Sequence, residues 1–122
     1  MNKRSIGAEF ELVAENWMNR NGFTLLHKNW QDAHREIDLI MENSNRRVFI
    51  EVKSNSARSN GFPEDKISRL KKSHLIRSMN KYNELYPTQK QIQWDIIAIT
   101  QDVHALQLFH MKDAFFGAKL WI

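Results

Sequence analysis

The chain has 122 residues, 42% hydrophobic and 26% charged, and a formal net charge of +4 at pH 7, which predicts one globular domain over residues 1–122 and excludes a disordered chain or fibrous repeat. The absence of cysteine excludes disulfides, thiolate nucleophiles and thiolate zinc sites. No apolar run reaches the length of a membrane span, and the first residues lack the apolar stretch of a secretory signal, so we expect a cytoplasmic protein without a membrane partner.

The first half of the chain predicts one helix followed by three strands. Ser5 is a suitable N-cap and Gly22 a suitable terminator for a helix that runs to about Asn21. Alternating apolar and polar residues then predict strands, the last two joined by a tight turn at Ser44 and Asn45. These strands cover residues 23–30, 36–41 and 47–53.

The second half predicts a loop, a basic amphipathic helix and two more strands. Residues 54–63 are rich in serine and asparagine, which is typical of a loop, and apolar residues recur at helical spacing over residues 64–86. Strands follow at residues 92–100 and 105–110, and we expect the phenylalanine-rich end of the chain to pack on the core. The order αβββαββ indicates an α/β fold, a mixed β-sheet flanked by helices.

Acidic side chains fall on adjacent predicted strands. In the second strand, the period of two places Asp38 on the face of Glu36, and Ile37, Leu39 and Met41 on the opposite face. In the third strand, Glu51 and Lys53 share a face. A two-residue turn at Ser44 and Asn45 would place Asp38 opposite Glu51 and Glu36 opposite Lys53.

Facing carboxylates destabilise a strand pair unless a cation lies between them. We expect Mg²⁺ or Mn²⁺ there, held by Asp38, Glu51 and the backbone carbonyl of Val52, because hard divalent cations prefer oxygen ligands. Lys53 would hold the attacking water and offset charge on a phosphate, which suits phosphodiester hydrolysis. The alternative is a solvated strand face whose charges have no chemical role.

Two motifs, EIDLI at residues 36–40 and FIEVK at residues 49–53, stand in order with weaker matches along nearly the whole chain. This pattern resembles the PD-(D/E)XK nuclease superfamily, and the whole chain resembles the YraN-like family of predicted endonucleases. The resemblance implies a restriction-endonuclease-like core and a metal-dependent nuclease acting on DNA, with branched or junction DNA as a candidate substrate. The weaker matches are Gly7, Glu11, Ala14, Gly22, Phe23, Asn29, Ile67, Lys71, WDIIAI at residues 94–99 and HMKDAF at residues 110–115.

The resemblance also implies that a first-helix glutamate faces the metal site. Glu11 is the matching residue and Glu9 the competitor. Three positions depart from the family pattern: Arg35 stands where a glycine usually precedes the EID motif, Phe10 replaces the glycine before the helix glutamate, and Asn55 stands where an arginine often follows the EVK motif. The catalytic set expected from residues and resemblance together is Asp38, Glu51, Lys53 and Glu11.

The expected partner is nucleic acid, with DNA preferred. Basic residues after Lys53 could contact phosphates from the loop and second helix, although the wet face of an amphipathic helix has the same composition. The candidates are Arg58, Lys66, Arg69, Lys71 and Lys72. A homodimer through the aromatic C-terminal segment is a further expectation. The rival to the nuclease is a non-catalytic nucleic-acid-binding module of the same fold; a purely structural interaction domain would leave the facing carboxylates without a reason.

Overall fold

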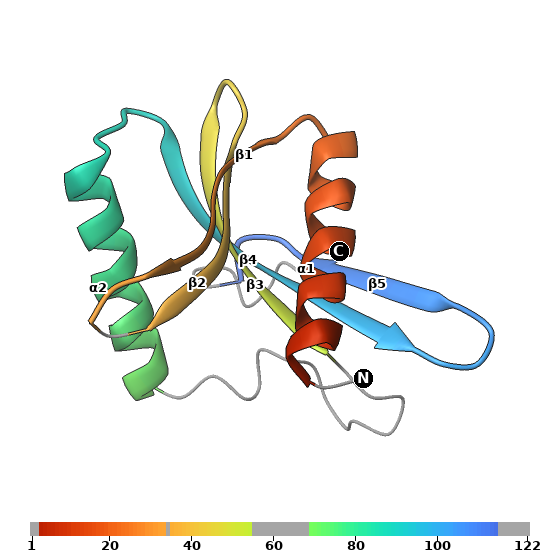
Figure 1. Ribbon diagram of the computed structural model, residues 1–122. Helices are drawn as coiled ribbons and strands as arrows, with labels where there is room; N and C mark the ends of the chain where they lie inside the picture. The colour runs from red at the N-terminus through yellow and green to blue at the C-terminus, as the bar shows by residue number, and fades with distance from the viewer. Residues whose placement is uncertain (1–2, 34, 55–68, 115–122) are drawn as a thin grey trace.

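A mixed five-stranded β-sheet lies between two helices in the computed structural model, which describes residues 3–33, 35–54 and 69–114 (Figure 1). The strand order is β1-β2-β3-β4-β5, with β3 and β4 parallel and the other neighbours antiparallel. This arrangement confirms the α/β fold predicted from the sequence. The elements are α1 (Lys3–Arg20), β1 (Thr24–Gln31), β2 (Glu36–Glu42), β3 (Arg46–Ser54), α2 (Arg69–Leu85), β4 (Gln91–Gln101) and β5 (Leu106–Met111).

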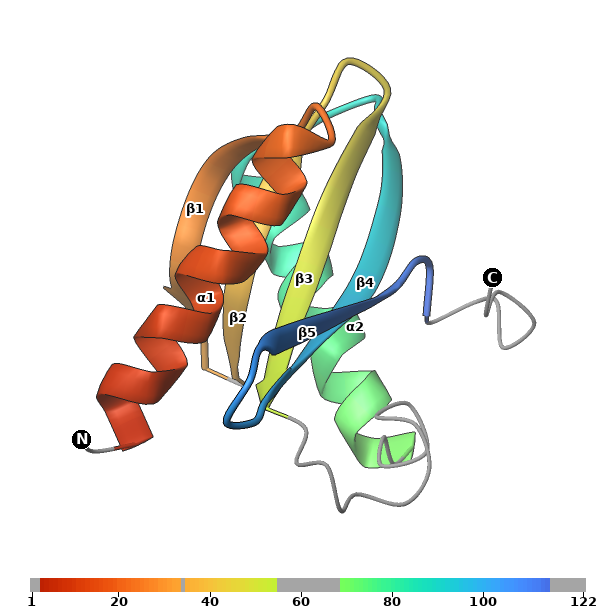
Figure 2. The ribbon, with the colours of Figure 1, turned by 90° about the vertical axis from the view of Figure 1, so that its right-hand side faces the viewer.

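Helix α1 covers one face of the sheet (Figure 2). It packs there through a narrow apolar stripe. Phe10, Ala14 and Met18 recur every four residues and are buried, since this spacing keeps them on one side of the helix. Phe10 was treated only as a departure from the family pattern, and it is a core residue. The strand residues in this cluster are Leu39, Met41, Val48, Ile50, Ile97 and Ile99.

Helix α2 covers the opposite face through Leu75, Met79 and Tyr82, again at helical spacing. Its described part begins at Arg69, so the predicted start at residue 64 lies outside the described residues, as do residues 55–63 of the predicted loop and the C-terminal segment from residue 115. The strand residues that pack in this cluster include Ile37, Ile40, Phe49, Trp94 and Ile96.

The hairpin of β2 and β3 has the predicted register. Leu39 pairs with Ile50, and the pairing continues to Glu42 with Arg47. The Asn43 amide donates to the Arg46 carbonyl at 3.0 Å, which leaves two residues in the turn. In an antiparallel pair this register brings positions 38 and 51 to facing places, one step beyond the last paired residues.

A polar network joins β4, β5 and α1 inside the fold. The Asp95 carboxylate, 1% exposed, accepts hydrogen bonds from the Gln93 side chain and the Asp113 amide, both at 2.8 Å, and lies 2.7 Å from Nε2 of His110. Nε1 of Trp17 donates to Nδ1 of His110 at 3.0 Å, so the proton of this imidazole is on Nε2 and faces Asp95. The network fixes α1 against the β4–β5 hairpin.

None of the helices in the described ranges is long and apolar enough to cross a membrane.

We expect Asp95→Ala to lower the free energy of unfolding by about 3 kcal/mol, because it leaves buried hydrogen-bond donors without an acceptor. Denaturant titration measures this change. The control is Glu9→Ala, which removes an exposed carboxylate from α1 and should change stability by less than about 0.5 kcal/mol. Equal effects of the two substitutions would contradict the structural role of the network.

Candidate active site

The strand pair β1–β2 shifts register between Leu25 and His27, and it has a second irregular backbone position opposite Asp38. Lys28 pairs with Leu39 and Trp30 with Ile37, and between them Asn29 has a left-handed backbone with φ of 55°. Asparagine is one of the few residues that adopt this conformation readily. A kink therefore lies where Asp38 faces Asn29.

The faces of β2 change between Ile37 and Leu39, at the level of Asn29. Ile37 packs in the α2 cluster together with Ile40, whereas Leu39 and Met41 pack in the α1 cluster. The prediction that Ile37 shares a face with Leu39 and Met41 was therefore wrong, because strict alternation requires a strand without such an irregularity.

The Asp38 carboxylate replaces the backbone ladder where β2 and β3 end their pairing. Its Oδ2 accepts a hydrogen bond from the Val52 amide at 2.8 Å, beyond the last paired residues, Leu39 and Ile50. The side chain of one strand thus holds the backbone of the next. This bond also fixes the direction of the carboxylate.

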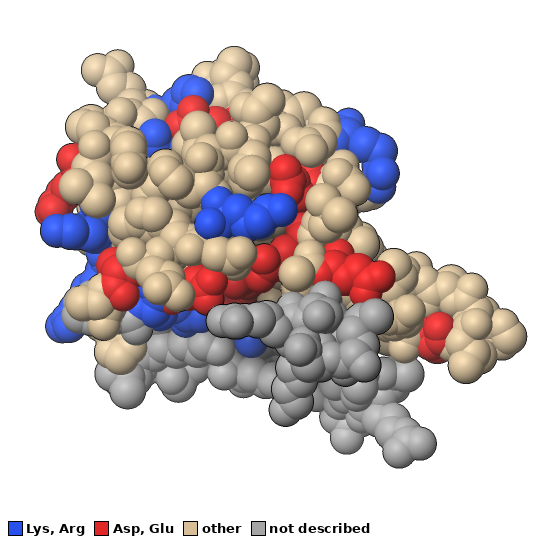
Figure 3. Space-filling model, in the orientation of Figure 1, with Lys and Arg blue, Asp and Glu red and all other residues tan. Residues whose placement is uncertain are grey.

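Four carboxylates act on one another around Asp38. Burial raises the pKa of Asp38 to about 7, the Val52 hydrogen bond opposes this shift, and the charges of Glu11, Glu51 and Glu36 add to it. In Figure 3, acidic side chains gather between α1 and the strands. An excess of negative charge in a partly buried place favours a bound cation.

Glu51 lies next to two cations. Its Oε1 is 2.6 Å from Nη2 of Arg35, and its Oε2 is 3.9 Å from Nζ of Lys53. Oε2 is buried and has no hydrogen-bond partner among the described residues. Arg35 is the residue that sequence reasoning missed: it was noted only as a departure from glycine, and a cation directly before an acidic strand was the available signal.

Glu11 is the α1 carboxylate whose charge adds to the raised pKa of Asp38. Burial, with the charge of Glu36, raises the pKa of Glu11, while a hydrogen bond to Asn29 and the charge of Lys28 oppose this shift. Glu9 is exposed. A pocket of about 420 Å³ lies beside Glu11, between α1 and strands β1 and β2. It is lined by Gly7, Ala8, Glu11, Asn29, Gln31 and Glu36.

The donor set fits a hard cation with an open coordination sphere. Within the described ranges no three histidine or acidic side chains form a group that could hold a metal ion. Asp38 and Glu51 nevertheless supply carboxylate oxygens, one of them the buried, unbonded Oε2 of Glu51. Mg²⁺ commonly binds through one or two carboxylates and completes its six ligands with water and phosphate.

The candidate phosphate contacts are only partly described. Lys72 lies half-buried on α2, and the side chains of Arg69 and Lys71 are not among those described. Arg58 and Lys66 lie outside the described residues.

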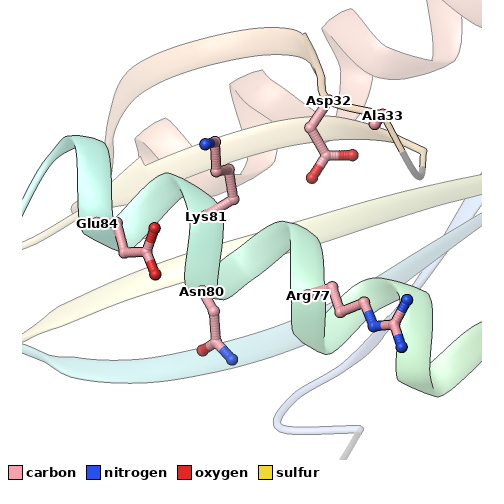
Figure 4. A pocket seen from close by; sticks show the side chains of 6 residues that line it. All are labelled: Asp32, Ala33, Arg77, Asn80, Lys81 and Glu84. Atoms are coloured by element: carbon pink, nitrogen blue, oxygen red, sulfur yellow. The ribbon is translucent and has the colours of Figure 1, made fainter.

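A second pocket, of about 390 Å³, lies between α2 and the β1–β2 connection (Figure 4). The cations Arg77 and Lys81 are balanced there by Asp32 and Glu84, so the lining does not favour a polyanion.

Comparison with known proteins gives a family match over most of the chain. The model of the Uncharacterised protein family UPF0102 matches residues 10–99. The UPF0102 protein of Carboxydothermus hydrogenoformans is 34% identical over 116 residues, 93% of this chain and 97% of that protein. The UPF0102 protein of Sulfurihydrogenibium sp. is 31% identical over 116 residues, 94% and 97% of the two chains. The matched range includes the four carboxylates and Lys53.

Among solved structures, Pyrococcus furiosus SfsA in complex with Ca²⁺ is 13% identical and has a TM-score of 0.44, with coverage of 92% of this chain and 64% of that chain. A likeness at this TM-score supports no inference about the site.

We expect Asp38→Asn to be more stable than the parent at pH 8 in chelator. The pKa of Asp38 is raised from 3.8 to about 7, so the stability that its protonated form contributes is present at pH 4 and is lost as the pH rises to about 7. The amide oxygen can still accept from Val52. The gain should be on the order of 2 kcal/mol at pH 8 and should disappear near pH 4.

Thermal or denaturant unfolding at both pH values measures this difference. The matched control is Glu9→Gln, which neutralises an exposed carboxylate and should leave the stability unchanged at both. A difference between Asp38→Asn and the parent that is the same at pH 4 and pH 8 would show that the carboxyl titrates in its ordinary range.

Proposed function

The chain belongs to the UPF0102 family, and we propose that it is a metal-dependent nuclease that hydrolyses phosphodiester bonds in DNA. The observation that carries this proposal is the half-buried Asp38, which meets the charges of three further carboxylates at the end of the β2–β3 pairing, with Lys53 beside Glu51. Buried like charges are costly, and proteins retain them mainly where a cation or a reaction uses them.

We assign the cation to Asp38 and Glu51, with the backbone carbonyl of Val52 as a third ligand. Mg²⁺ or Mn²⁺ bound there would supply Lewis acidity and lower the pKa of a water molecule. The Val52 amide holds Asp38 by one oxygen, which leaves the other oxygen of the carboxylate for the ion. Glu11 adds negative charge from α1 and is assigned a supporting role.

Lys53 is assigned to the phosphate. Its Nζ lies 3.9 Å from Oε2 of Glu51, so the ammonium is attracted to this carboxylate from beyond hydrogen-bond distance. A cation held at this place orients a water and offsets the charge that develops on phosphate oxygens.

The proposed partner is the DNA backbone, contacted by the basic residues that follow Lys53 in the sequence. Of the five candidate contacts, Lys72 alone has a described side chain, and it is half-buried on α2. A homodimer through the C-terminal segment remains part of the proposal; that segment lies outside the described residues.

A second candidate function is a non-catalytic nucleic-acid-binding module. The contact between Arg35 and Glu51 favours it, because a guanidinium at 2.6 Å neutralises Glu51 without any metal ion. Cleavage assays on branched, nicked, single-stranded and duplex DNA, each with Mg²⁺, Mn²⁺ or chelator, separate the two functions.

We expect Asp38→Asn to abolish cleavage, since a neutral amide is a poor ligand for a hard cation. In chelator the same substitution should leave DNA affinity equal or slightly higher, because it removes negative charge near the phosphates. Lys53→Ala should also abolish cleavage but should weaken DNA binding. Gel-shift and cleavage assays measure the two effects, with Glu9→Ala as the inert control.

If both variants cleave DNA at the parent's rate, Asp38 and Lys53 are ordinary charged residues on a strand face and have no catalytic role. Persistent opposite signs in binding, without cleavage by the parent on any substrate, would establish the binding module instead.

We expect the double variant Lys71→Ala and Lys72→Ala to bind DNA more weakly, with a salt slope shallower by about 1–2, because fewer counterions are released. The matched control, Arg20→Ala with Arg46→Ala, removes two exposed cations at the end of the molecule that carries the β2–β3 turn. Fluorescence anisotropy over a range of salt concentrations measures both slopes. An unchanged slope for the lysine pair would mean that α2 faces water.

A further inference from the structure

Arg35 is held in place by the connection between β1 and β2. Its amide donates to Oδ1 of Asp32 at 3.0 Å, and its carbonyl accepts from the Asp32 amide at 3.2 Å. Its Nε donates to the carbonyl of Glu36 at 3.4 Å. The backbone and the base of the guanidinium are thus fixed, and one end of the guanidinium reaches β3.

This end of the Arg35 guanidinium contacts Glu51 where both side chains are largely shielded from water. The 2.6 Å contact joins side chains that are 20% and 11% exposed, so water screens the pair only partly. Lys53 is more than 1 Å farther from the same carboxylate. Arg35 is therefore the nearest cation to Glu51 among the described residues.

The contact places two cations in competition for one carboxylate. A divalent ion bound to Glu51 would lie about 2–2.5 Å from the carboxylate oxygen. A guanidinium that kept its present contact would then face a double positive charge at short range, with only a partly aqueous surrounding to screen it. With the ion on the unbonded Oε2 and the guanidinium on Oε1, the two cations would lie on the same carboxylate, and their repulsion favours release of the guanidinium.

We propose that Arg35 is an internal counter-ion: it holds Glu51 when no divalent ion is present and leaves Glu51 when such an ion binds. This inference rests on the proposed metal site, and it assigns Arg35 a positioning role rather than a catalytic one. The cost of displacing Arg35 lowers the affinity of the site for the ion, while the contact stabilises the ion-free protein.

The test compares Mn²⁺ binding by titration calorimetry for the parent, Arg35→Met and Arg35→Lys. Methionine keeps an unbranched side chain without charge, so Arg35→Met should bind Mn²⁺ about tenfold more tightly than the parent, the equivalent of about 1.4 kcal/mol. Arg35→Lys keeps a competing cation and should stay close to the parent.

Thermal unfolding provides an independent readout. In chelator, Arg35→Met should melt below the parent because Glu51 loses its nearest counter-ion, and Mn²⁺ should raise its melting temperature by more than it raises the parent's. The matched control is Lys90→Ala, which removes a cation 2.9 Å from the half-buried Glu42 at the other end of the hairpin. It should lower stability in chelator without changing the response to Mn²⁺.

Each outcome decides the matter. Equal or weaker Mn²⁺ binding by Arg35→Met than by the parent overturns the counter-ion role and leaves the metal site standing. Absence of Mn²⁺ binding in the parent and in every variant overturns the metal site and this inference together. Binding by Arg35→Met alone supports the counter-ion role and shows that Arg35 closes the site in the parent.

Discussion

The hydrogen bond from the Val52 amide to the Asp38 carboxylate is the contact on which the arrangement of the site depends. It lies where the backbone pairing of β2 and β3 ends, so the Asp38 side chain joins the two strands at the point beyond which their backbones are no longer paired. Its cost is a carboxylate in a partly buried place close to the charges of Glu11, Glu36 and Glu51. The kink at Asn29 belongs to the same feature, because it interrupts the β1 pairing opposite Asp38.

The acidic groups at the two ends of the β2–β3 hairpin have neighbours of opposite charge. At the turn end, Glu42 has Arg47 and Lys90 each at 2.9 Å; burial acts to raise its pKa, but these two partners lower it overall. At the other end, burial raises the pKa of Asp38, and neighbours of its own sign add to this shift. One hairpin therefore carries an acid paired with cations, Glu42, and an acid surrounded by like charges, Asp38. An acid surrounded by like charges is typical of functional sites.

The sequence allowed the fold and the hairpin register to be predicted, because alternation and turn chemistry are local properties. Phe10, a buried residue of α1, was not predicted to be part of the core. The reversed face of Ile37 was not predictable from alternation, since it is a departure from the period of two within β2 itself. The contact from Arg35 to Glu51 joins residues 16 positions apart through a connection whose course no periodicity specifies.

The parallel pairing of β3 with β4 has a consequence for synthesis on the ribosome. Arg46 pairs with Gln91, 45 residues later, so the hairpin that carries the acids emerges long before its neighbour. At about 5–20 residues per second, the inner edge of β3 stays without its partner strand for several seconds. During that interval an apolar strand edge is open to pairing with other chains.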